Sequence, residues 1–264
     1  MGNLKDGLKS ASSGNLKAMM IEQKLNSLFS IKRNPEKEAK FIKILLEREG
    51  ESQERVGLHA SAMLAGDKDF CLRQQVLSLV FKQIQGDNIP VKLKRVFEEG
   101  NSVHQKWQRL FIAGGLGEPE DMDRHRFIKK YELSYTPDAR IHIFGEDVLV
   151  EIKSMNTYAF KKATGHPSGE KQLNFYLCCE KLKWGFVLAE DKNDQEFKVF
   201  VVKRDVEAAR MYLDRLVDIK EAKQYFIESG KMPKRICSSC DCKMAEKCNM
   251  RDACWNVGIG RVKI

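Results

Sequence analysis

The sequence predicts an α/β (α+β) fold in which a central mixed β-sheet is flanked by helices. Three observations support this class. A chain of 264 residues, 42% of them hydrophobic, is long enough to bury one good core. Helical patterns fill the chain up to about residue 113. Alternating apolar segments follow, and the resulting order α–β–β–β–α–β–β–α is typical of a mixed sheet packed against helices.

The N-terminal part is predicted to be helical. Residues 1–30 are polar and weakly periodic, which indicates a mobile arm or a loosely docked helix. A charged helix is expected from Pro35 to about Glu49, where Gly50 ends it. Residues 61–82 predict a short polar turn and then a helix. Residues 91–113 predict a long amphipathic helix, whose apolar face carries Val96, Val103, Trp107 and Leu110.

Strands dominate the second half of the chain. The segment 127–144, FIKKYELSYTPDARIHIF, alternates between apolar and polar residues and predicts two strands around a bend. The next strand, EDVLVEIKS at 146–154, is expected to follow a hairpin at Gly145–Glu146. The remaining predicted elements are a loop at 163–169, a helix at 170–182, strands at 184–190 and 197–203, a helix at 204–228, and a short Pro- and Cys-rich stretch from Gly230.

Charge and composition narrow the classes of partner and compartment. The net charge of +9 favours a polyanionic partner. No apolar run approaches the roughly 18 residues that would cross a membrane, and the N-terminus lacks the apolar centre of a signal peptide. We therefore expect a cytoplasmic or nucleoid-associated protein that is not secreted. In such a compartment its eight cysteines indicate bound metal or free thiols rather than disulfides.

Two charged residues interrupt the apolar strand VLVEIKS at 148–154. Glu151 and Lys153 are two positions apart, so they project from the same face of a strand. If the neighbouring strands pair, Asp138 lies beside Glu151, and a hard cation such as Mg²⁺ or Mn²⁺ commonly offsets the repulsion of two close carboxylates. Such a cation polarises a phosphate, while Lys153 could orient the attacking water. The alternative is a surface hairpin with an ordinary Glu–Lys pair.

Two helices supply further candidates. His104 lies on the helix before the sheet, and a neutral imidazole can add a nitrogen ligand to the same ion. Gln172 and Tyr176 are spaced i, i+4, so they share one helical face and could hold a phosphate or a water above the carboxylates. The alternatives are an ordinary helical histidine and a polar helix face.

Read in order, the motifs are G-x3-H, P-D, E-x-K and Q-x3-Y, and this ordered set resembles the PD-(D/E)xK nucleases of the RecB type. The resemblance implies a restriction-endonuclease-like core. It also implies that His104, Asp138 and Glu151 bind the metal. Lys153 would assist the attack of water on a phosphodiester. The matching helix motif, which supports the active site and the DNA strand, consists of Gln172 and Tyr176.

The resemblance covers most of the chain and suggests a division into domains. We expect an N-terminal arm and helix at 1–56 and a RecB-like nuclease domain at 57–254. That domain would include the Cys-rich segment at 230–254, which we expect a bound metal to hold in place. A C-terminal tail would occupy 255–264.

The cysteines predict a second metal site. Five of the eight lie close together, at 237, 240, 242, 248 and 254, and this density suggests zinc or an iron–sulfur cluster. A Cys₄ zinc site could be built from this group alone. Either metal would tie down segments too short and polar to fold by themselves. Cys178 and Cys179, which lie in the apolar helix after Gln172, are interpreted as core packing.

A CRISPR-associated and helicase-linked subgroup of RecB-like nucleases carries a structural [4Fe-4S] cluster, and the chain resembles it in part. Cys71 in CLRQQ matches the first ligand, and CNMRDAC matches the final C-x5-C with Cys248 and Cys254. The sequence departs at the remaining position, which is Ala245. The resemblance then implies Cys242 as the fourth ligand with Cys237 as the alternative, while Cys240 is less favoured and a structural Zn²⁺ remains the competing metal.

These observations together predict a Mg²⁺- or Mn²⁺-dependent deoxyribonuclease. We expect an exonuclease that acts on single-stranded DNA or duplex ends in DNA processing, recombination or repair. Trp107, Tyr158 and Phe160 are candidates for base stacking, although core packing is the favoured role of Trp107. The sequence has no G-x4-G-K-[ST] motif, so a helicase or recombination partner would be a separate protein. The alternatives are a non-catalytic nucleic-acid-binding subunit with a zinc or Fe–S site, and a zinc-stapled regulatory protein.

Overall fold

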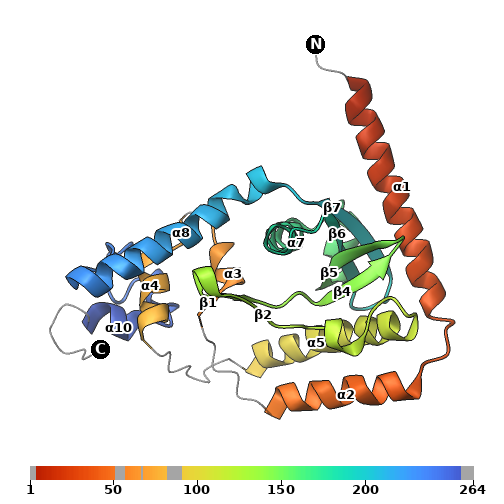
Figure 1. The fold of residues 1–264 in the computed structure, drawn as a ribbon, viewed down its shortest axis with the longest axis horizontal. Coiled ribbons are helices and arrows are strands. Elements are labelled where there is room, and N and C mark those ends of the chain that lie inside the picture. Colours follow the sequence, from red (N-terminus) through yellow and green to blue (C-terminus); the bar gives the residue numbers. More distant parts are fainter. Residues whose placement is uncertain (1–3, 51–56, 67, 82–90, 257–264) are drawn as a thin grey trace. The chain divides into compact units, whose positions relative to one another are not determined.

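The computed structural model describes residues 4–50, 57–66, 68–81 and 91–256 (Figure 1). These residues pack as two compact units, and each unit is assembled from separate stretches of the chain. The first unit takes its residues from Met1–Gln53, Pro90–His125 and Thr136–Val206. The second takes its residues from Glu54–Ile89, Arg126–Tyr135 and Glu207–Ile264. Part of the predicted arm and most of the predicted tail at 255–264 lie outside the described residues.

The first unit is built on a four-stranded sheet with the order β4-β5-β6-β7. The outer pairs, β4–β5 and β6–β7, are antiparallel, whereas the central pair β5–β6 is parallel. The sheet is therefore mixed, and the predicted α/β (α+β) class is confirmed. The strands are β4 (Ala139–Ile143), β5 (Glu146–Met155), β6 (Trp184–Asp191) and β7 (Phe197–Lys203).

The connections between strands follow from the direction of pairing. Strands β4 and β5 are joined by a two-residue turn at Phe144–Gly145, where both residues have positive φ, 53° and 77°. This geometry matches the right-handed twist of a hairpin, and it places the turn one residue earlier than predicted. The parallel pair β5–β6 requires a crossover. The crossover contains α7 (Pro167–Glu180) and the short helix α6 (Thr157–Lys162), which the sequence analysis did not predict.

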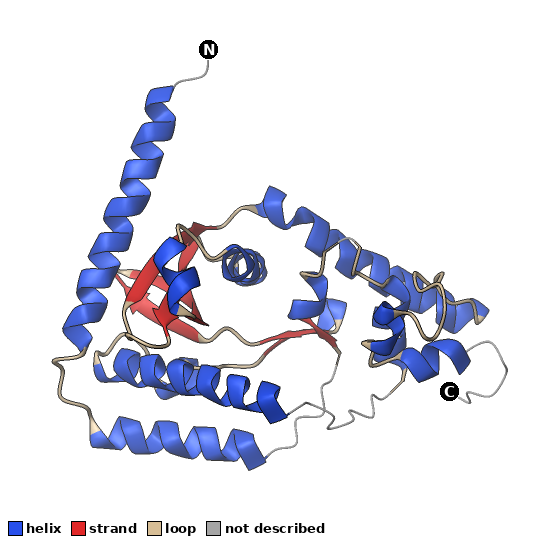
Figure 2. Cartoon of the chain, turned by 180° about the vertical axis from the view of Figure 1, so that it is seen from behind, coloured by secondary structure: helices blue, strands red, loops and turns tan. Residues whose placement is uncertain are grey.

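Helices cover both faces of this sheet. On one face, the helices α1 (Leu4–Leu28) and α5 (Val91–Ala113) enclose a core that includes Trp107, Val150 and Ile152. On the other face, α7 contacts β5 and β6. Helix α2 (Pro35–Gly50) packs against α5, and the two run side by side in Figure 2. Alternate residues of β5 therefore point toward α5 or toward α7.

Helix α1 decides between the two predictions for the N-terminal residues, a mobile arm and a loosely docked helix. Ile21, Leu25 and Leu28 recur at i, i+4 and i+7 and are fully or almost fully buried in the core of the first unit. The reading as a docked helix was therefore the right one. The face of α5 also differs from the prediction at one end, because Val96 is exposed whereas Val103, Trp107 and Leu110 are buried.

The second unit contains a small three-stranded sheet with the order β1-β3-β2. The sequence analysis placed 127–144 in one pair of strands around a bend. The structure instead assigns β2 and β3 to this sheet and β4 to the larger one, and Pro137 lies in the break between them. The elements of the second unit are β1 (Leu58–His59), β2 (Arg126–Ile128), β3 (Leu133–Tyr135), α3 (Ala60–Met63), α4 (Leu72–Val80), α8 (Val206–Ser229), α9 (Lys243–Glu246) and α10 (Arg251–Asn256).

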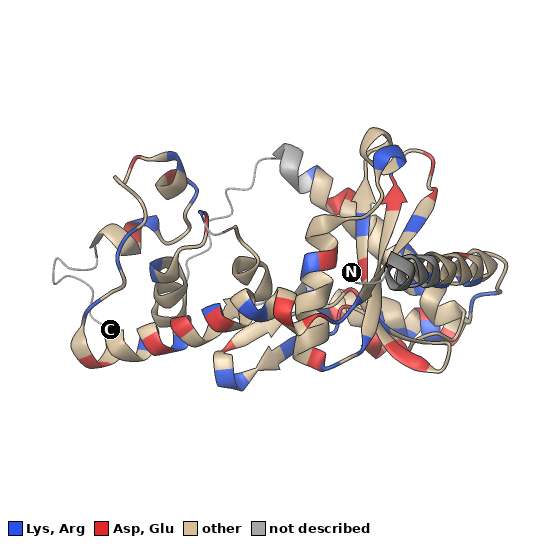
Figure 3. Ribbon diagram, turned by 90° about the horizontal axis from the view of Figure 1, so that it is seen from above, with Lys and Arg blue, Asp and Glu red and all other residues tan. Residues whose placement is uncertain are grey.

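Charged residues are mixed along both units. Figure 3 shows lysines and arginines interspersed with aspartates and glutamates along the helices and strands. The net charge of +9 is thus spread over the chain rather than confined to one basic block. In the part of the chain that the structure describes, no helix is both long and apolar enough to span a membrane.

Candidate active site

Asp138 is held rigidly at the start of the hairpin. It directly precedes β4, whose first residue, Ala139, pairs with Val150 of β5. The Oδ2 atom of Asp138 accepts a hydrogen bond from the backbone N–H of Ile152 at 2.6 Å. Its backbone carbonyl accepts another from Nε2 of Gln108 at 2.8 Å. These contacts fix the carboxylate, and its Oδ1 atom lies 3.5 Å from Nδ1 of His104.

Glu151 and Lys153 project from β5 toward the face covered by α7. Nζ of Lys153 lies 2.6 Å from Oε1 of Glu151 and 3.4 Å from Oε1 of Gln172 on α7. Glu151 is only 1% exposed, and among the described residues its buried Oε2 atom has no hydrogen-bond partner. A surface Glu–Lys pair would be exposed to water, so the ordinary hairpin alternative does not describe this pair.

Burial and neighbouring charge shift the pKa values of this pair. Burial, together with the nearby charge of Asp138, raises the pKa of Glu151 to about 8. Burial alone would lower the pKa of Lys153, but the ion pair with Glu151 outweighs it and raises the pKa. Lys153 is therefore an ammonium at neutral pH. A cation bound beside Glu151 would favour its ionised form.

His104 and Asp123 complete the acidic group around Asp138. His104 lies on α5, and its Nδ1 is 3.5 Å from Oδ1 of Asp138. Ligand atoms of His104, Asp123 and Asp138 all lie within 4.8 Å of one another, as the donors of one metal ion would. Burial and the charge of Asp138 raise the pKa of Asp123 to about 6. Glu151 is not part of this close group, although its pKa responds to both aspartates.

The sequence analysis missed Asp123. The residue lies in the segment DMDRHRF, between the short 3-10 helix η1 (Pro119–Asp121) and β2, where neither a repeat nor a motif marks it. Its backbone N–H donates to the carbonyl of Asp138 at 3.1 Å, and this contact carries it to the site. The pair of acidic residues Asp121 and Asp123 was the only local signal, and such pairs are common in loops.

Gln172 and Tyr176 form a hydrogen-bonded pair next to Lys153. Nε2 of Gln172 donates to the hydroxyl of Tyr176 at 3.0 Å, and this bond orients the Oε1 atom that faces Lys153. Tyr176 is 1% exposed, and burial raises the pKa of its hydroxyl, so the group is neutral. The i, i+4 pair thus contacts the lysine, and its predicted role of holding a phosphate or a water stays a prediction.

The three candidate stacking residues have different environments. Trp107 is buried, and its Nε1 donates to Oε2 of Glu190 at 2.6 Å, which agrees with a packing role. Phe160 is 2% exposed, so its ring is not accessible to a base. Tyr158 is 71% exposed on α6, directly after β5, and Nζ of Lys162 lies 4.0 Å from the centre of its ring.

The second unit gathers the predicted metal-binding cysteines. Cys71, Cys237, Cys248 and Cys254 line one cavity. Cys71 caps α4, and its Sγ accepts a hydrogen bond from the backbone N–H of Gln74 at 3.4 Å. The residues that line this cavity include the alternative ligand Cys237 but not Cys242.

A buried arginine supports the cysteine group. Arg73 is 6% exposed, and its Nε donates to Sγ of Cys254 at 3.2 Å. Its two terminal nitrogens donate to the backbone carbonyls of Pro233 and Cys254. These bonds join α4 to both ends of the Cys-rich segment.

Several thiols of this group lie close enough to affect one another. Burial raises the pKa of Cys237 to about 11, and a side-chain hydrogen bond with Cys242 and the nearby thiols of Cys71 and Cys248 act in the same direction. Cys178 and Cys179 lie in the first unit and are half-buried, so they pack only partly in the core.

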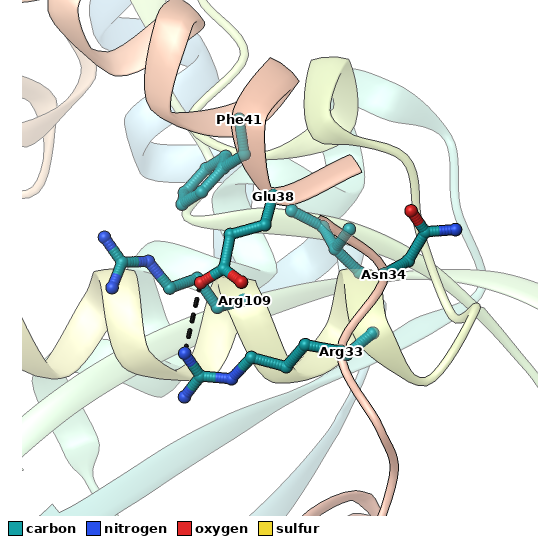
Figure 4. Close-up of a pocket in the computed structure, with 7 residues that line it drawn as sticks. Arg33, Asn34, Glu38, Phe41 and Arg109 are labelled. Atoms are coloured by element: carbon teal, nitrogen blue, oxygen red, sulfur yellow. Dashed lines mark hydrogen bonds and ion pairs between the residues drawn. The ribbon is translucent and has the colours of Figure 1, made fainter. Parts of the chain in front are cut away.

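A separate small cavity lies between α2 and α5 (Figure 4). It is lined by Arg33, Glu38, Phe41 and Arg109 among others, and Arg33 forms an ion pair with Glu38 at 3.1 Å. Its volume of about 10 Å³ accommodates one water molecule at most. This cavity is therefore no substrate site, and the acidic group at Asp138 remains the candidate active site of the first unit.

Comparisons with known proteins do not identify the chain. No protein-family model matches it, and no curated protein sequence matches it. The crystal structure of SSO0001 gives a TM-score of 0.43 at 13% identity, over 83% of this chain and 96% of that one. Two structures of LHK-Exo, an alkaline exonuclease from Laribacter hongkongensis, give a TM-score of 0.46 at 16% identity. One is a complex with dAMP, and each match covers 66% of this chain and 93% of LHK-Exo. Similarity of this size assigns neither a family nor a function.

Proposed function

We propose that this protein is a divalent-cation-dependent nuclease that hydrolyses phosphodiester bonds in DNA. The observation that carries the proposal is the convergence of Asp138, Glu151 and Lys153. A fixed carboxylate, a buried carboxylate with an unpartnered oxygen and a half-buried ammonium lie together at one hairpin. His104 approaches the same group from α5. A protein that only bound phosphate would gain nothing from buried carboxylates, which repel it.

Each residue then has a defined role. His104, Asp138 and Glu151 would hold the cation. An imidazole nitrogen and carboxylate oxygens form a donor set that suits Mn²⁺, whereas Mg²⁺ is better suited to a set with fewer nitrogen ligands. When bound, the cation supplies polarisation of the phosphate and activation of water. Lys153 donates a hydrogen bond to the attacking water or to a phosphate oxygen, which stabilises developing negative charge. Gln172 and Tyr176 keep the lysine in that orientation.

The substrate is DNA, and the proposed mode is exonucleolytic cleavage of single strands or of duplex ends. The basic balance of the chain favours contact with phosphates. Tyr158, exposed next to Lys162 and directly after β5, is suited to stack a base near the carboxylates. We place the protein in DNA processing, recombination or repair in the cytoplasm or nucleoid, where a separate helicase or recombination protein would open the duplex.

We also propose that Cys71, Cys237, Cys248 and Cys254 would hold a [4Fe-4S] cluster. Their common cavity and the bond from Arg73 to Cys254 support this donor set. Cys237 takes the place for which the sequence favoured Cys242. The role is structural, because the ligands join α4 to a short segment with little core of its own.

End-labelled DNA tests the nuclease proposal. We expect purified protein with Mn²⁺ to shorten linear single-stranded or double-stranded DNA over time. Asp138→Asn and Lys153→Ala should each lower the rate at least 100-fold, because each removes a group from the reacting centre. Lys203→Ala, an exposed lysine at the end of β7, is the matched control and should keep full activity. Undiminished cleavage by both site variants would overturn the assignment.

Absorption and iron analysis test the cysteine site. Anaerobically purified protein should show a broad band at about 400 nm, where thiolate-to-iron charge transfer falls, and should contain iron. Cys237→Ser and Cys248→Ser should lose both signals. Cys240→Ser, whose thiol is exposed, and Cys242→Ser should keep them. Colourless protein that contains zinc would contradict the cluster.

A further inference from the structure

We propose that Asp123 is a further ligand of the divalent cation, so that three carboxylates and one imidazole of this chain hold the ion. The inference rests on the cation site of the proposed function and adds a residue to it. The ordered motifs contain His104, Asp138 and Glu151 only. Asp123 enters the site from the segment before β2, which no motif covers.

The distances suit one ion. Ligand atoms of His104, Asp123 and Asp138 lie within 4.8 Å of one another. Ligands on opposite sides of a six-coordinate Mg²⁺ or Mn²⁺ are about 4.2 Å apart, since each bond is about 2.1 Å long. Adjacent ligands are about 3.0 Å apart, so the three atoms would share one cation after shifts of up to about 1 Å each.

The placement of Asp123 does not depend on its carboxylate. Its backbone N–H donates to the carbonyl of Asp138, and the preceding Met122 forms a bridge with Ala139. The carbonyl of Met122 accepts a bond from Arg48 at 2.9 Å. The φ of Asp123 is 45°, a left-handed conformation that Asp and Asn both tolerate. The backbone thus brings this position to the site, and an asparagine side chain, whose amide oxygen can also accept the hydrogen bond from Gln108, would serve the fold without the charge.

The charge of Asp123 needs another explanation, because it adds to an acidic site. Asp138 lies beside it, and Glu151 is close enough for both aspartates to act on it electrostatically. The ammonium of Lys153, which is half-buried, is already bonded to Oε1 of Glu151. A hydrogen bond from Gln108, the imidazole of His104 and Arg48 offset the charge of Asp123 only in part, because its pKa remains raised. A divalent cation offsets the excess.

Glu151 supplies an independent sign of a missing partner. Its side chain is almost fully buried, yet Oε2 has no hydrogen bond among the described residues. Buried carboxylate oxygens are normally satisfied. Glu151 lies outside the close group of His104, Asp123 and Asp138, but both aspartates act on it electrostatically, so its Oε2 atom is the candidate fourth ligand of an ion held there. Four protein ligands would leave a six-coordinate ion two positions, for water and for a phosphate oxygen.

Direct Mn²⁺ titration of the protein without DNA tests the inference. We expect Asp123→Asn to weaken Mn²⁺ binding at least ten-fold, and Asp138→Asn to weaken it at least as much. Asp194→Asn changes an exposed carboxylate in the β6–β7 turn and should bind Mn²⁺ like the unmodified protein. Melting in EDTA reports on folding. Asp123→Asn should melt at the same or a higher temperature, because the substitution removes repulsion and preserves the shape of the side chain.

The outcomes separate this inference from the nuclease proposal. If Asp123→Asn binds Mn²⁺ as tightly as the unmodified protein, the inference is wrong, whether or not the protein cuts DNA. If binding depends on Asp123 but the protein leaves DNA intact, Asp123 is a ligand and the nuclease proposal fails. A protein that binds no Mn²⁺ at all overturns both.

Discussion

Single residues define the energetics of the candidate site. Glu151 is a carboxyl group placed where water cannot reach it, next to a second carboxyl group and one ammonium. Such a group destabilises the metal-free fold unless it holds its proton or a cation binds. The free energy of unfolding of the metal-free protein should therefore depend on pH. The raised pKa of Glu151 determines whether it rises or falls with pH.

We expect the metal-free protein to lose stability as the pH rises from about 5 to about 8. The unfolded chain releases the proton of Glu151 near its ordinary pKa of 4.5, whereas the folded chain holds it up to a pKa of about 8. The folded state therefore binds more protons in this window, and raising the pH favours unfolding. Asp123, with a pKa raised to about 6, acts in the same direction.

Melting temperatures in EDTA at pH 5 to 8 measure this dependence. Glu151→Gln should flatten the slope and leave only the part that Asp123 contributes. Glu207→Gln, at an exposed position on α8, should keep the slope of the unmodified protein. A melting temperature that rises steadily with pH would contradict the raised pKa.

The sequence predicted Asp138, Glu151 and Lys153 correctly as neighbours because the relation is local. A period of two places Glu151 and Lys153 on one face of a strand, and a two-residue turn sets Asp138 against that strand. Asp123 could not be predicted in this way. Its approach depends on a backbone bond to Asp138 from an irregular segment, and irregular segments have no period.

Helix α1 shows that the burial of a helix can be underestimated from its hydrophobic periodicity. Its apolar contacts are concentrated in the last two turns, at Ile21, Leu25 and Leu28, whereas Leu16 is exposed. A pattern averaged over residues 1–30 is therefore weak, although the buried face is well defined. Most other long helices and strands were predicted correctly. The short helix α6 and the separate sheet of β1, β2 and β3 were missed, because elements of two to six residues carry too little periodicity.

Leu25→Ala should destabilise the first unit by about 2–5 kcal/mol, the usual cost of a large cavity in a packed core. Leu25 is fully buried against the sheet core. Leu16→Ala changes the same type of residue on the same helix at a position that is 60% exposed, and it should cost less than about 0.5 kcal/mol. Urea denaturation followed by tryptophan fluorescence measures both values. Equal stability of the two variants would mean that α1 is an arm after all.

The whole molecule carries its excess positive charge in dispersed form, with lysines and arginines among acidic residues (Figure 3). Contact with a DNA backbone would therefore involve several scattered cations, each of which displaces a counterion. The affinity for DNA should therefore depend on the salt concentration, even where the sequence specificity does not.

We expect DNA affinity to fall at least 10-fold between 50 and 200 mM KCl, with a linear relation between the logarithms of affinity and salt concentration. Fluorescence anisotropy with labelled single-stranded DNA and the cleavage-deficient Lys153→Ala variant measures this slope. Asp194→Asn, which removes an exposed negative charge, should bind as tightly or slightly more tightly. An affinity independent of salt would exclude phosphate contacts as the main source of binding.

The tight turn at Phe144–Gly145 has a consequence for the order of folding. Glu151 follows Asp138 by only 13 residues, so the β4–β5 hairpin can close within microseconds. The parallel pairing of β5 with β6, and the packing of α5, join parts of the chain that are far apart, and they form more slowly. The carboxylates thus meet while water still screens them, and their repulsion grows only as the later elements enclose them. We therefore expect Mn²⁺ to accelerate the last step of refolding and to leave hairpin formation unchanged.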